Sequence, residues 1–558
     1  GDFDESLIEA TINNYKMQMM RSFEENESRA MLYVYSFING ADWADEVQQL
    51  DRMSKITKQD VVDWANKYLG PESYAIVYKR EGKDPNEQKI AAPKITPIVT
   101  NRDSQSEFLT EIQNSKVEPI EPVFVDYKKD MSQFEAQKGV NVLYKKNETN
   151  DIFTLIYVFN TGTENDPALN LAFDYLSYLG TDKMSAEQIA SEMYAIACSF
   201  GLSAGTNQSW IEISGLSENM GKAMEIVEGL IAGAQPNEEI LQNLKGDMIK
   251  SRADAKLNQS RCFGALQRYM IYGSDFIRRT TLTDPALQGL TSEQLLAKIG
   301  DLMGKQHEVL YYGPQDEAEV KAALAAHHKV AADLQPLEKK FSTLQPTDEN
   351  KVMLAQYDAK QLYYMQYSNR GEKFDLAADP QITLYNEYFG GGMNTIVFQE
   401  MREARGLAYS AWANLAIPTN AKGDYYYMAF IATQNDKMQK AIEAFDEIIN
   451  NMPESEKAFD IAKEALISRL RTERTVKDGV LWSYIRMRDL GLTEPRGKQI
   501  FEKAQQMTLA DVKAAQEKWV KGRKYVYGIL GDIQDLDLNY LKTLGPIQTV
   551  TQEEIFGY

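Results

Sequence analysis

The sequence is poor in the residues that bind metals and cross-link small secreted domains. Its 558 residues include only three histidines and two cysteines, Cys198 and Cys262. Two cysteines cannot form a disulfide framework, and they suit a reducing compartment or a disulfide-free periplasmic protein equally well. The sequence therefore leaves both a periplasmic and a cytoplasmic location open.

Long apolar runs are also missing. No stretch approaches the roughly eighteen apolar residues that a membrane-spanning helix needs, so membrane insertion is not expected. The first residues, Gly-Asp-Phe-Asp-Glu, include neither an initiator methionine nor a signal sequence. Ile8, Ile12, Tyr15 and Met19 follow them at helical spacing. We therefore expect the chain to begin just before a helix that belongs to a larger protein.

Basic residues are outnumbered by acidic ones, 61 to 81, which gives a net charge of −20. Such a chain is not attracted to nucleic acid or to an anionic membrane surface, so neither is expected as a partner. Hydrophobic residues make up 43% of the chain and charged residues 25%, as in a globular protein. A chain of this length exceeds one hydrophobic core and predicts several domains.

A helix-start pattern occurs three times along the chain. Thr57, Thr291 and Thr508 each stand three residues before an Asp or Gln, close to the pattern of a capping box. The threonines are 234 and 217 residues apart. An apolar strand is expected after each predicted helix, at 74–78, 307–312 and 525–530.

The same register continues upstream of the threonines. Asn26-Glu27-Ser28-Arg29 matches Asn258-Gln259-Ser260-Arg261, and Lys477-Asp478-Gly479 is the corresponding segment of the third copy. A glycine follows each segment after 12, 13 and 12 residues, at Gly40, Gly273 and Gly491. The chain therefore contains a module of about 210 to 230 residues, present twice in full and once as its C-terminal part.

Within a module, strands come first, helices follow and one strand closes the unit. Residues 140–144 and 152–159 are strand-like and are joined by a polar segment, which predicts a hairpin. In the last module a strand is expected at 424–433 and an amphipathic helix at 437–450. This order predicts an α+β fold of repeated two-layer α/β sandwich domains. The expected parts are a C-terminal piece of one domain (1–82), a hinge linker (83–122), and two complete domains (123–340 and 341–558).

Residues 389–410 combine a glycine turn, an amphipathic helix and a polar exit. Gly390 to Gly392 interrupt the chain, apolar Met393, Val397 and Met401 recur every fourth residue, and Gly406 is placed to end the helix. No G-K-[ST] follows the glycines, which argues against a phosphate-binding loop. By chemistry alone, Arg402 and Tyr409 would be an ordinary surface arginine and a packed tyrosine.

This segment is similar to a signature of the pitrilysin/insulinase-type zinc metallopeptidases, the inverzincins. In their C-terminal domains a glycine-rich turn leads to F-x-x-x-R and then G-L-x-Y, where this chain has Phe398, Arg402, Gly406, Leu407 and Tyr409. The resemblance implies four homologous domains, two in each half, that enclose a chamber. It also implies zinc in the first domain, with an arginine and a tyrosine contributed by the fourth.

The resemblance requires an H-x-x-E-H helix for zinc, which this chain does not supply. His307 begins a predicted strand, and His327 and His328 are neighbours on a helix expected over 316–333, where adjacent side chains diverge by about 100°. The five motif positions align with residues 171–175, where Leu171 and Tyr175 replace both histidines and Asp174 replaces the glutamate. We therefore expect no metal site and no self-sufficient catalytic residue in this chain, and no G-x-S-x-G elbow or cysteine motif offers another nucleophile.

Two functions remain open. In the first, the chain is the non-catalytic C-terminal half of a zinc endopeptidase, which closes the chamber and binds unstructured peptide substrates. The resemblance implies that Arg402 binds main-chain carbonyls and that Tyr409 donates a hydrogen bond to the oxyanion. Its partner is then the N-terminal half of the same protein, or a catalytic partner subunit, and the full-length protein carries zinc. In the second, the chain is a catalytically dead relative that serves as a scaffold or as a subunit of a heteromeric complex.

Overall fold

The structure, a computed structural model, describes residues 3–82 and 106–558. Most of the predicted hinge linker therefore lies outside the described residues. Its last part, from 106 to 122, contains the short helix α6 (Glu107–Asn114). No helix within the two described ranges is both long and apolar enough to cross a membrane.

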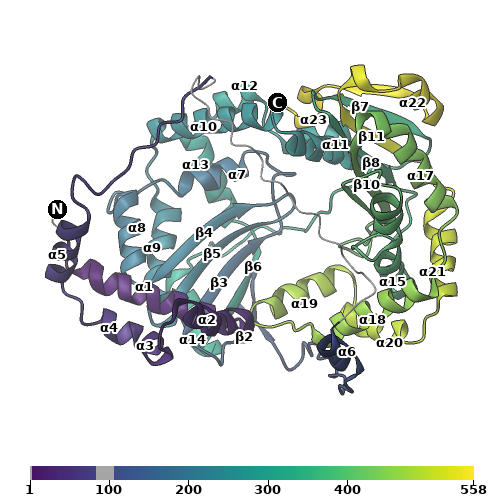
Figure 1. Cartoon of the computed structure of the whole chain (residues 1–558). Coiled ribbons are helices and arrows are strands. Elements are labelled where there is room, and N and C mark those ends of the chain that lie inside the picture. The colour runs from purple at the N-terminus through teal and green to yellow at the C-terminus, as the bar shows by residue number, and fades with distance from the viewer. Residues whose placement is uncertain (1–2, 83–105) are drawn as a thin grey trace.

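Two six-stranded mixed sheets dominate the fold (Figure 1). The first sheet has the order β1-β2-β6-β3-β5-β4 and the second the order β12-β7-β11-β8-β10-β9. The strands of the first are β1 (Ser132–Gln137), β2 (Val140–Lys146), β3 (Ile152–Phe159), β4 (Cys198–Ala204), β5 (Ser209–Leu216) and β6 (His307–Gly313). Those of the second are β7 (Lys351–Gln356), β8 (Gln361–Ser368), β9 (Ser410–Ala416), β10 (Tyr426–Gln434), β11 (Val526–Gly531) and β12 (Ile547–Val550). The predicted α+β fold of repeated units is confirmed, while the boundary at residue 340 stays a prediction.

β6 and β11, which the sequence predicts as closing strands, lie inside their sheets. β6 pairs in parallel with β2 and antiparallel with β3, and β11 does the same with β7 and β8. The hairpin predicted from residues 140–159 is therefore wrong, because β6 separates its two strands. Val309, Leu310 and Tyr311 of β6 are fully buried, and such an apolar strand is stable only with neighbours on both edges.

Most helices pack on the face of each sheet that points away from the other unit, and they form the two main cores (Figure 1). On the first sheet they are α7 (Leu169–Leu176), α8 (Ala186–Ala195), α9 (Met220–Gly233), α10 (Glu238–Lys256), α12 (Asp284–Gly289), α13 (Ser292–Met303) and α14 (Glu317–His327). The second unit has α15 (Asp379–Phe389), α16 (Ile396–Phe398), α17 (Met438–Asn450), α18 (Glu456–Thr472), α20 (Arg496–Ala504), α21 (Leu509–Ala515), α22 (Leu538–Leu544) and α23 (Gln552–Phe556). Short 3₁₀ turns are η1 (Ser217–Asn219), η3 (Asn435–Lys437) and η5 (Ile533–Asp535), and π-helical turns are η2 (Gln399–Ala404) and η4 (Gln516–Val520). The helix predicted at 437–450 is confirmed, and the one predicted at 316–333 ends already at His327.

Two helices cross from one unit to the other. α11 (Gln259–Thr280) follows α10 in the first unit but packs on the face of the second sheet that points toward the first unit, beside β11 and α23 (Figure 1). α19 (Gly479–Asp489) follows α18 in the second unit but packs on the face of the first sheet that points toward the second unit (Figure 1). Each unit therefore completes the hydrophobic core of the other.

The N-terminal piece consists of helices alone among the described residues. These are α1 (Ser6–Phe23), α2 (Asn26–Asn39), α3 (Trp43–Val47), α4 (Gln49–Met53) and α5 (Lys58–Tyr68). α1, predicted from its apolar spacing, packs against α8 and β3, where Met17 contacts Ile152 and Leu216. The strand predicted at 74–78 is wrong, because no described strand lies beside these residues and their side chains are exposed.

The repeated positions have repeated roles in the backbone. The N–H groups of Thr57, Thr291 and Thr508 each donate to the side chain three residues on, at 2.9, 3.0 and 2.8 Å. The predicted helix starts are thereby confirmed. The glycines that follow α2, interrupt α11 and follow α19 have φ angles of 62°, 83° and 70° at Gly40, Gly273 and Gly491. This left-handed conformation favours glycine, which explains why all three copies have one.

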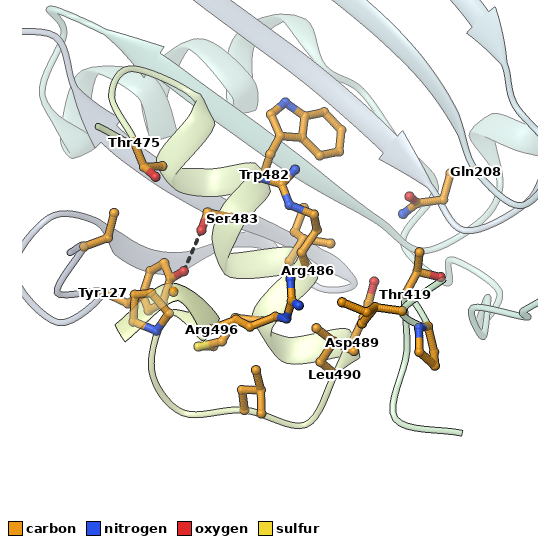
Figure 2. Close-up of a pocket in the computed structure, with 18 of the residues that line it drawn as sticks. Tyr127, Gln208, Thr419, Thr475, Trp482, Ser483, Arg486, Asp489, Leu490 and Arg496 are labelled. Carbon is orange, nitrogen blue, oxygen red and sulfur yellow. Dashed lines mark hydrogen bonds between the residues drawn. The ribbon is translucent and has the colours of Figure 1, made fainter. Parts of the chain in front are cut away.

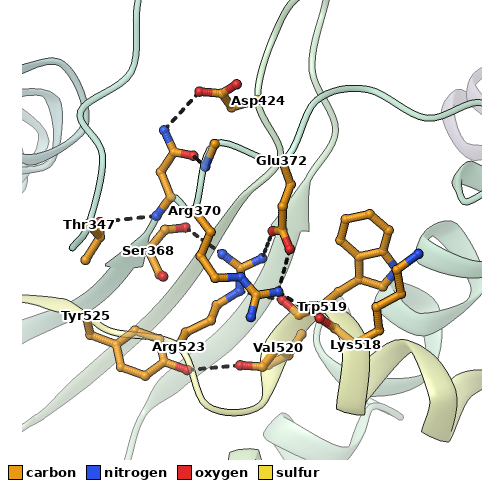
Figure 3. Close-up of polar contacts among 12 residues, drawn as sticks. Thr347, Ser368, Arg370, Glu372, Asp424, Lys518, Trp519, Val520, Arg523 and Tyr525 are labelled. Carbon is orange, nitrogen blue, oxygen red and sulfur yellow. Dashed lines mark hydrogen bonds and ion pairs between the residues drawn. The ribbon is translucent and has the colours of Figure 1, made fainter. Parts of the chain in front are cut away.

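A buried ionic cluster closes the second unit (Figure 3). Arg523, just before β11, has a fully buried side chain and donates to a carboxylate oxygen of Glu372 at 2.6 Å. Arg523 also donates to the Ser368 carbonyl at 3.3 Å, and Arg370 donates to the other oxygen of Glu372 at 2.5 Å. The cluster joins the end of β8 to the turn that leads into β11.

Candidate functional site

The glycine triplet forms a close contact between α15 and β9. Gly390 follows the last residue of α15, and a Cβ at this position would lie 1.8 Å from the carbonyl oxygen of Ala413. The Ala413 N–H in turn donates to the Gly390 carbonyl at 3.1 Å. A glycine is needed here for backbone approach, in agreement with a turn that does not bind phosphate.

The helix after the glycines is shorter than predicted. It begins at Ile396, has one α-helical turn in α16 and widens into the π-helical η2. Val397 and Met401 are buried as predicted, but Met393 lies before the helix and is exposed. Wide π turns are rare and occur often at functional sites.

Gly406 turns the chain back toward the helix. Its φ angle is 58°, and the next residue, Leu407, donates its N–H to the Met401 carbonyl at 2.9 Å. The turn places the Tyr409 ring beside Arg402, with the Arg402 guanidinium 5.3 Å from the ring centre. The Phe398 ring lies 5.0 Å from the same guanidinium. The structure thus brings Arg402 and Tyr409 together across a turn, with Phe398 as a third member.

Both candidate residues face solvent. Tyr409 is 75% exposed and the Arg402 side chain 41%, and the ion pair of Arg402 with Glu403 is loose, at 3.7 Å. The neighbouring Arg405 is bound more tightly, to Glu447 at 2.8 Å and to Glu400 at 3.4 Å. A planar guanidinium close to two aromatic rings, one of them a tyrosine, has the donors to bind carbonyl oxygens of an extended peptide.

The positions that align with a zinc motif are packed in the first unit. Leu171 and Tyr175 on α7 are buried, and only Asp174 between them is exposed. The Tyr175 hydroxyl lies 2.7 Å from Ser292 Oγ and accepts the N–H of Asn237 at 2.7 Å. Tyr175 therefore joins α7 to the starts of α10 and α13, and neither it nor Leu171 offers a nitrogen ligand for zinc.

The second unit repeats this tyrosine joint. Tyr388 on α15 accepts the N–H of Ser455, which caps α18, at 3.1 Å, and donates to the Pro453 carbonyl at 2.8 Å. Asn237 caps α10 in the same way. The buried tyrosine is thus a structural feature of both units.

Two of the three histidines meet in the core of the first unit. His307 Nε2 lies 2.8 Å from His328 Nε2, and His328 Nδ1 lies 2.5 Å from a carboxylate oxygen of Glu228. The Nδ1 of His307 is 2.8 Å from the Lys305 carbonyl, so it carries a proton. This direct contact leaves no room for an ion between the rings. Within residues 3–82 and 106–558, no group of three His, Cys, Asp or Glu side chains is placed to hold a metal.

A cavity of about 740 Å³ lies where the two units meet, and the sequence analysis missed it (Figure 2). Figure 2 shows Arg486 of α19 at the centre of its lining, with Gln208 and Thr419 on one side and Tyr127 on the other. Arg402 and Tyr409 are not among the lining residues. The lining comes from distant segments, so no continuous motif could have marked it.

Two α+β units whose sheets share the order of five strands, and which exchange a helix and share tyrosine joints and helix starts, define a protein of repeated two-layer α/β domains. Residues 304–466 match the family described as the peptidase M16 inactive domain. This match confirms the resemblance to the pitrilysin/insulinase-type metallopeptidases.

Curated relatives are zinc proteases by name. An uncharacterised zinc protease of Streptomyces coelicolor is 23% identical over 269 residues, which cover 45% of this chain and 56% of the relative. One of Rickettsia bellii is 24% identical over 310 residues, which cover 54% and 70%. The chain spans about half the length of the Streptomyces relative.

Solved structures share the fold. The peptidase M16 inactive domain from Pseudomonas fluorescens has a TM-score of 0.58 at 19% identity, covering 72% of this chain and 98% of its own. The periplasmic protease PqqL of Escherichia coli has a TM-score of 0.56 at 14% identity, covering 93% of this chain but 60% of PqqL. The ferredoxin protease FusC, solved with Arabidopsis ferredoxin, has a TM-score of 0.57 at 12% identity, with coverages of 91% and 58%.

Proposed function

We propose that this chain is the non-catalytic, C-terminal half of a zinc-dependent endopeptidase, which closes a chamber and binds peptide substrates. The observation that carries the proposal is the Arg402 guanidinium close to the rings of both Phe398 and Tyr409, with Tyr409 exposed. Relatives named as zinc proteases, and the partial coverage of PqqL and FusC, support it.

In this proposal the two exposed donors act on the substrate. Arg402 binds main-chain carbonyls of an extended peptide, because its fork of N–H groups remains open on the solvent side. Tyr409 donates its hydroxyl proton in a hydrogen bond to the oxyanion that forms at the scissile carbonyl. A fixed donor of this kind is worth roughly 3 kcal/mol, or about a hundredfold in rate.

Zinc fits no residues described in this chain, so it is expected on the preceding half or on a catalytic partner subunit. There it would activate the attacking water. In the first unit, the positions that align with the two histidines of H-x-x-E-H provide Leu171 and the hydrogen-bonded Tyr175 instead.

The test is the Tyr409→Phe variant in the complete protein, with an unstructured peptide as substrate. We expect kcat to fall about a hundredfold while bound zinc stays unchanged, because only one oxyanion donor is removed. Tyr178→Phe is the matched control, since Tyr178 is also an exposed tyrosine but lies on the first unit.

Cleavage by the parent protein should be lost on chelation, and the 558-residue chain alone should neither cleave nor bind zinc stoichiometrically. An unchanged kcat in Tyr409→Phe would reject the role of this residue. A complete protein that neither binds zinc nor cleaves peptide would instead support the scaffold function.

A further inference from the structure

The helix that crosses between units has a third copy in this chain, and that copy is uncovered. α2, α11 and α19 occupy the same place in the three modules, each beginning after an equivalent segment and reaching a left-handed glycine. α11 and α19 each cover the face of the other unit's sheet that lies opposite that sheet's own helix layer. α2 is joined to no sheet of its own module within the described residues.

α19 shows what such a helix does on the first sheet. Leu481 and Ile485 are buried against a cluster that the sheet supplies through Leu143, Ile156 and Leu310. These three come from β2, β3 and β6, the centre of the sheet. The helix therefore covers apolar strands that would otherwise face water.

α11 makes the same contact on the second sheet. Leu266 and Met270 are buried with Met365 of β8. A Cβ on Gly528 of β11 would lie 2.2 Å from the sulfur of Met270, so this strand glycine makes room for the helix. The contact is closely fitted at the centre of the sheet.

Counting back from the glycine of each copy shows which face of α2 is equivalent. Phe37 stands three residues before Gly40, as Met270 does before Gly273, and Phe37 is 87% exposed while Met270 is 2% exposed. Tyr33 stands seven residues before its glycine, where α11 has Leu266, and the exposures are 59% and 0%. The residues that α11 buries are thus apolar and exposed in α2.

The exposed face is continuous. Residues 30–39, Ala-Met-Leu-Tyr-Val-Tyr-Ser-Phe-Ile-Asn, contain no charged side chain. Ala30, Tyr33, Val34 and Phe37 follow i, i+3, i+4, i+7 spacing and form one stripe. An apolar stripe of this size on a soluble helix marks an interaction surface.

The corner between α1 and α2 holds α2 in place. Lys477 contacts Glu24 at 3.0 Å and Glu25 at 2.6 Å, the two residues between these helices. Asn150 also donates to Glu24, at 2.7 Å. With α1 packed on the first unit, α2 projects from a fixed corner (Figure 1).

We infer that the apolar face of α2 docks on the helix-free face of a six-stranded sheet in another domain of this fold, opposite that sheet's own helix layer, and that this domain precedes residue 1 in the complete polypeptide. The two complete modules exchange their crossing helices. The same exchange between the partial first module and the proposed preceding domain would cover α2. The coverage of only 60% of PqqL and 56% of the Streptomyces relative leaves length for such a domain. The inference concerns assembly and does not require peptidase activity.

Maleimide labelling of an introduced cysteine tests the inference, since both native cysteines are buried. Phe37→Cys should react rapidly in the 558-residue chain and at least tenfold more slowly in the complete polypeptide. Asn39→Cys, on the opposite side of the same helix, is the control and should react at the same rate in both.

Equal rates for Phe37→Cys in the two proteins would overturn the inference. So would equal slowing of both variants, because it would mean general shielding and not docking of one face. Protection of Phe37→Cys in the 558-residue chain that increases with protein concentration would identify a second copy as the occupant, and would also overturn it. None of these outcomes depends on whether the protein cleaves peptides.

Discussion

At the scale of single residues, the buried histidine pair makes the fold sensitive to pH. Burial, together with the neighbouring His328, lowers the pKa of His307 from 6.5 to about 4. His307 donates through Nδ1 to the Lys305 carbonyl and accepts through Nε2 from Nε2 of His328. A proton added at Nε2 of His307 would therefore oppose the N–H of His328. The neutral form is therefore the one that suits the folded state.

This arrangement predicts acid destabilisation with a defined sign. Below pH 6.5 the unfolded chain takes up a proton at His307 that the folded chain takes up only near pH 4, so stability is lost between these values. The loss amounts to about 3 kcal/mol. In His307→Gln, urea unfolding at pH 7 and pH 4.5 should show a smaller loss, whereas His327→Gln should behave like the parent. Identical pH dependence in parent and His307→Gln would contradict this assignment.

At the scale of elements, the ionic cluster at the start of β11 is a point of high local stability (Figure 3). Glu372→Gln removes the counter-ion of Arg523, whose side chain is fully buried. Leaving a buried charge unpaired costs roughly 3 kcal/mol, and the free energy of unfolding measured in urea should fall by about that amount.

The matched control is Glu494→Gln, which removes a partner of Lys498 from an exposed pair. Such pairs contribute less than about 1 kcal/mol. A similar loss in both variants would show that the cluster stabilises the unit no more than a surface pair does.

At the scale of the whole molecule, helix exchange joins the stability of the two units. Leu481→Ala removes a buried side chain of α19. This helix belongs to the second unit, but Leu481 packs on the first sheet. A cavity of this type costs about 2 to 5 kcal/mol. Amide hydrogen exchange should therefore accelerate in β2 and β3 of the first unit. Leu466→Ala, in the second unit's own core, should accelerate exchange there instead.

Faster exchange confined to the second unit in Leu481→Ala would mean that α19 is not needed by the first sheet. The same reasoning gives the inference about α2 its physical basis, since a sheet face in this architecture is completed by a helix from a neighbouring unit.

Much of the fold could be predicted because it depends on local chemistry. The three helix starts follow from a threonine and a carboxylate or amide three residues later. Arg402 and Tyr409 were found by the spacing of a short motif, and Phe398 belonged to the same pattern. Their proposed role in substrate binding stays a prediction.

The errors came where distant segments decide the outcome. The hairpin over 140–159 failed because β6, about 150 residues later, inserts between its strands. The strand at 74–78 failed because an apolar segment becomes a strand only beside a partner. The helix that was predicted to include Met393 begins only at Ile396, because the close contact of Gly390 with Ala413 keeps the preceding chain in a turn. The histidine pair and the cavity between the units left no linear signal at all.

The sequence by itself determined the repeated module, its helix starts and the residue types at 171–175, because each can be read from residue identity and spacing along the chain. Only the tertiary structure decided which strands pair, that α11 and α19 each pack on the sheet of the other unit, and that α2 remains uncovered. These outcomes depend on burying apolar faces between segments hundreds of residues apart, and the energy of that burial belongs to no single segment.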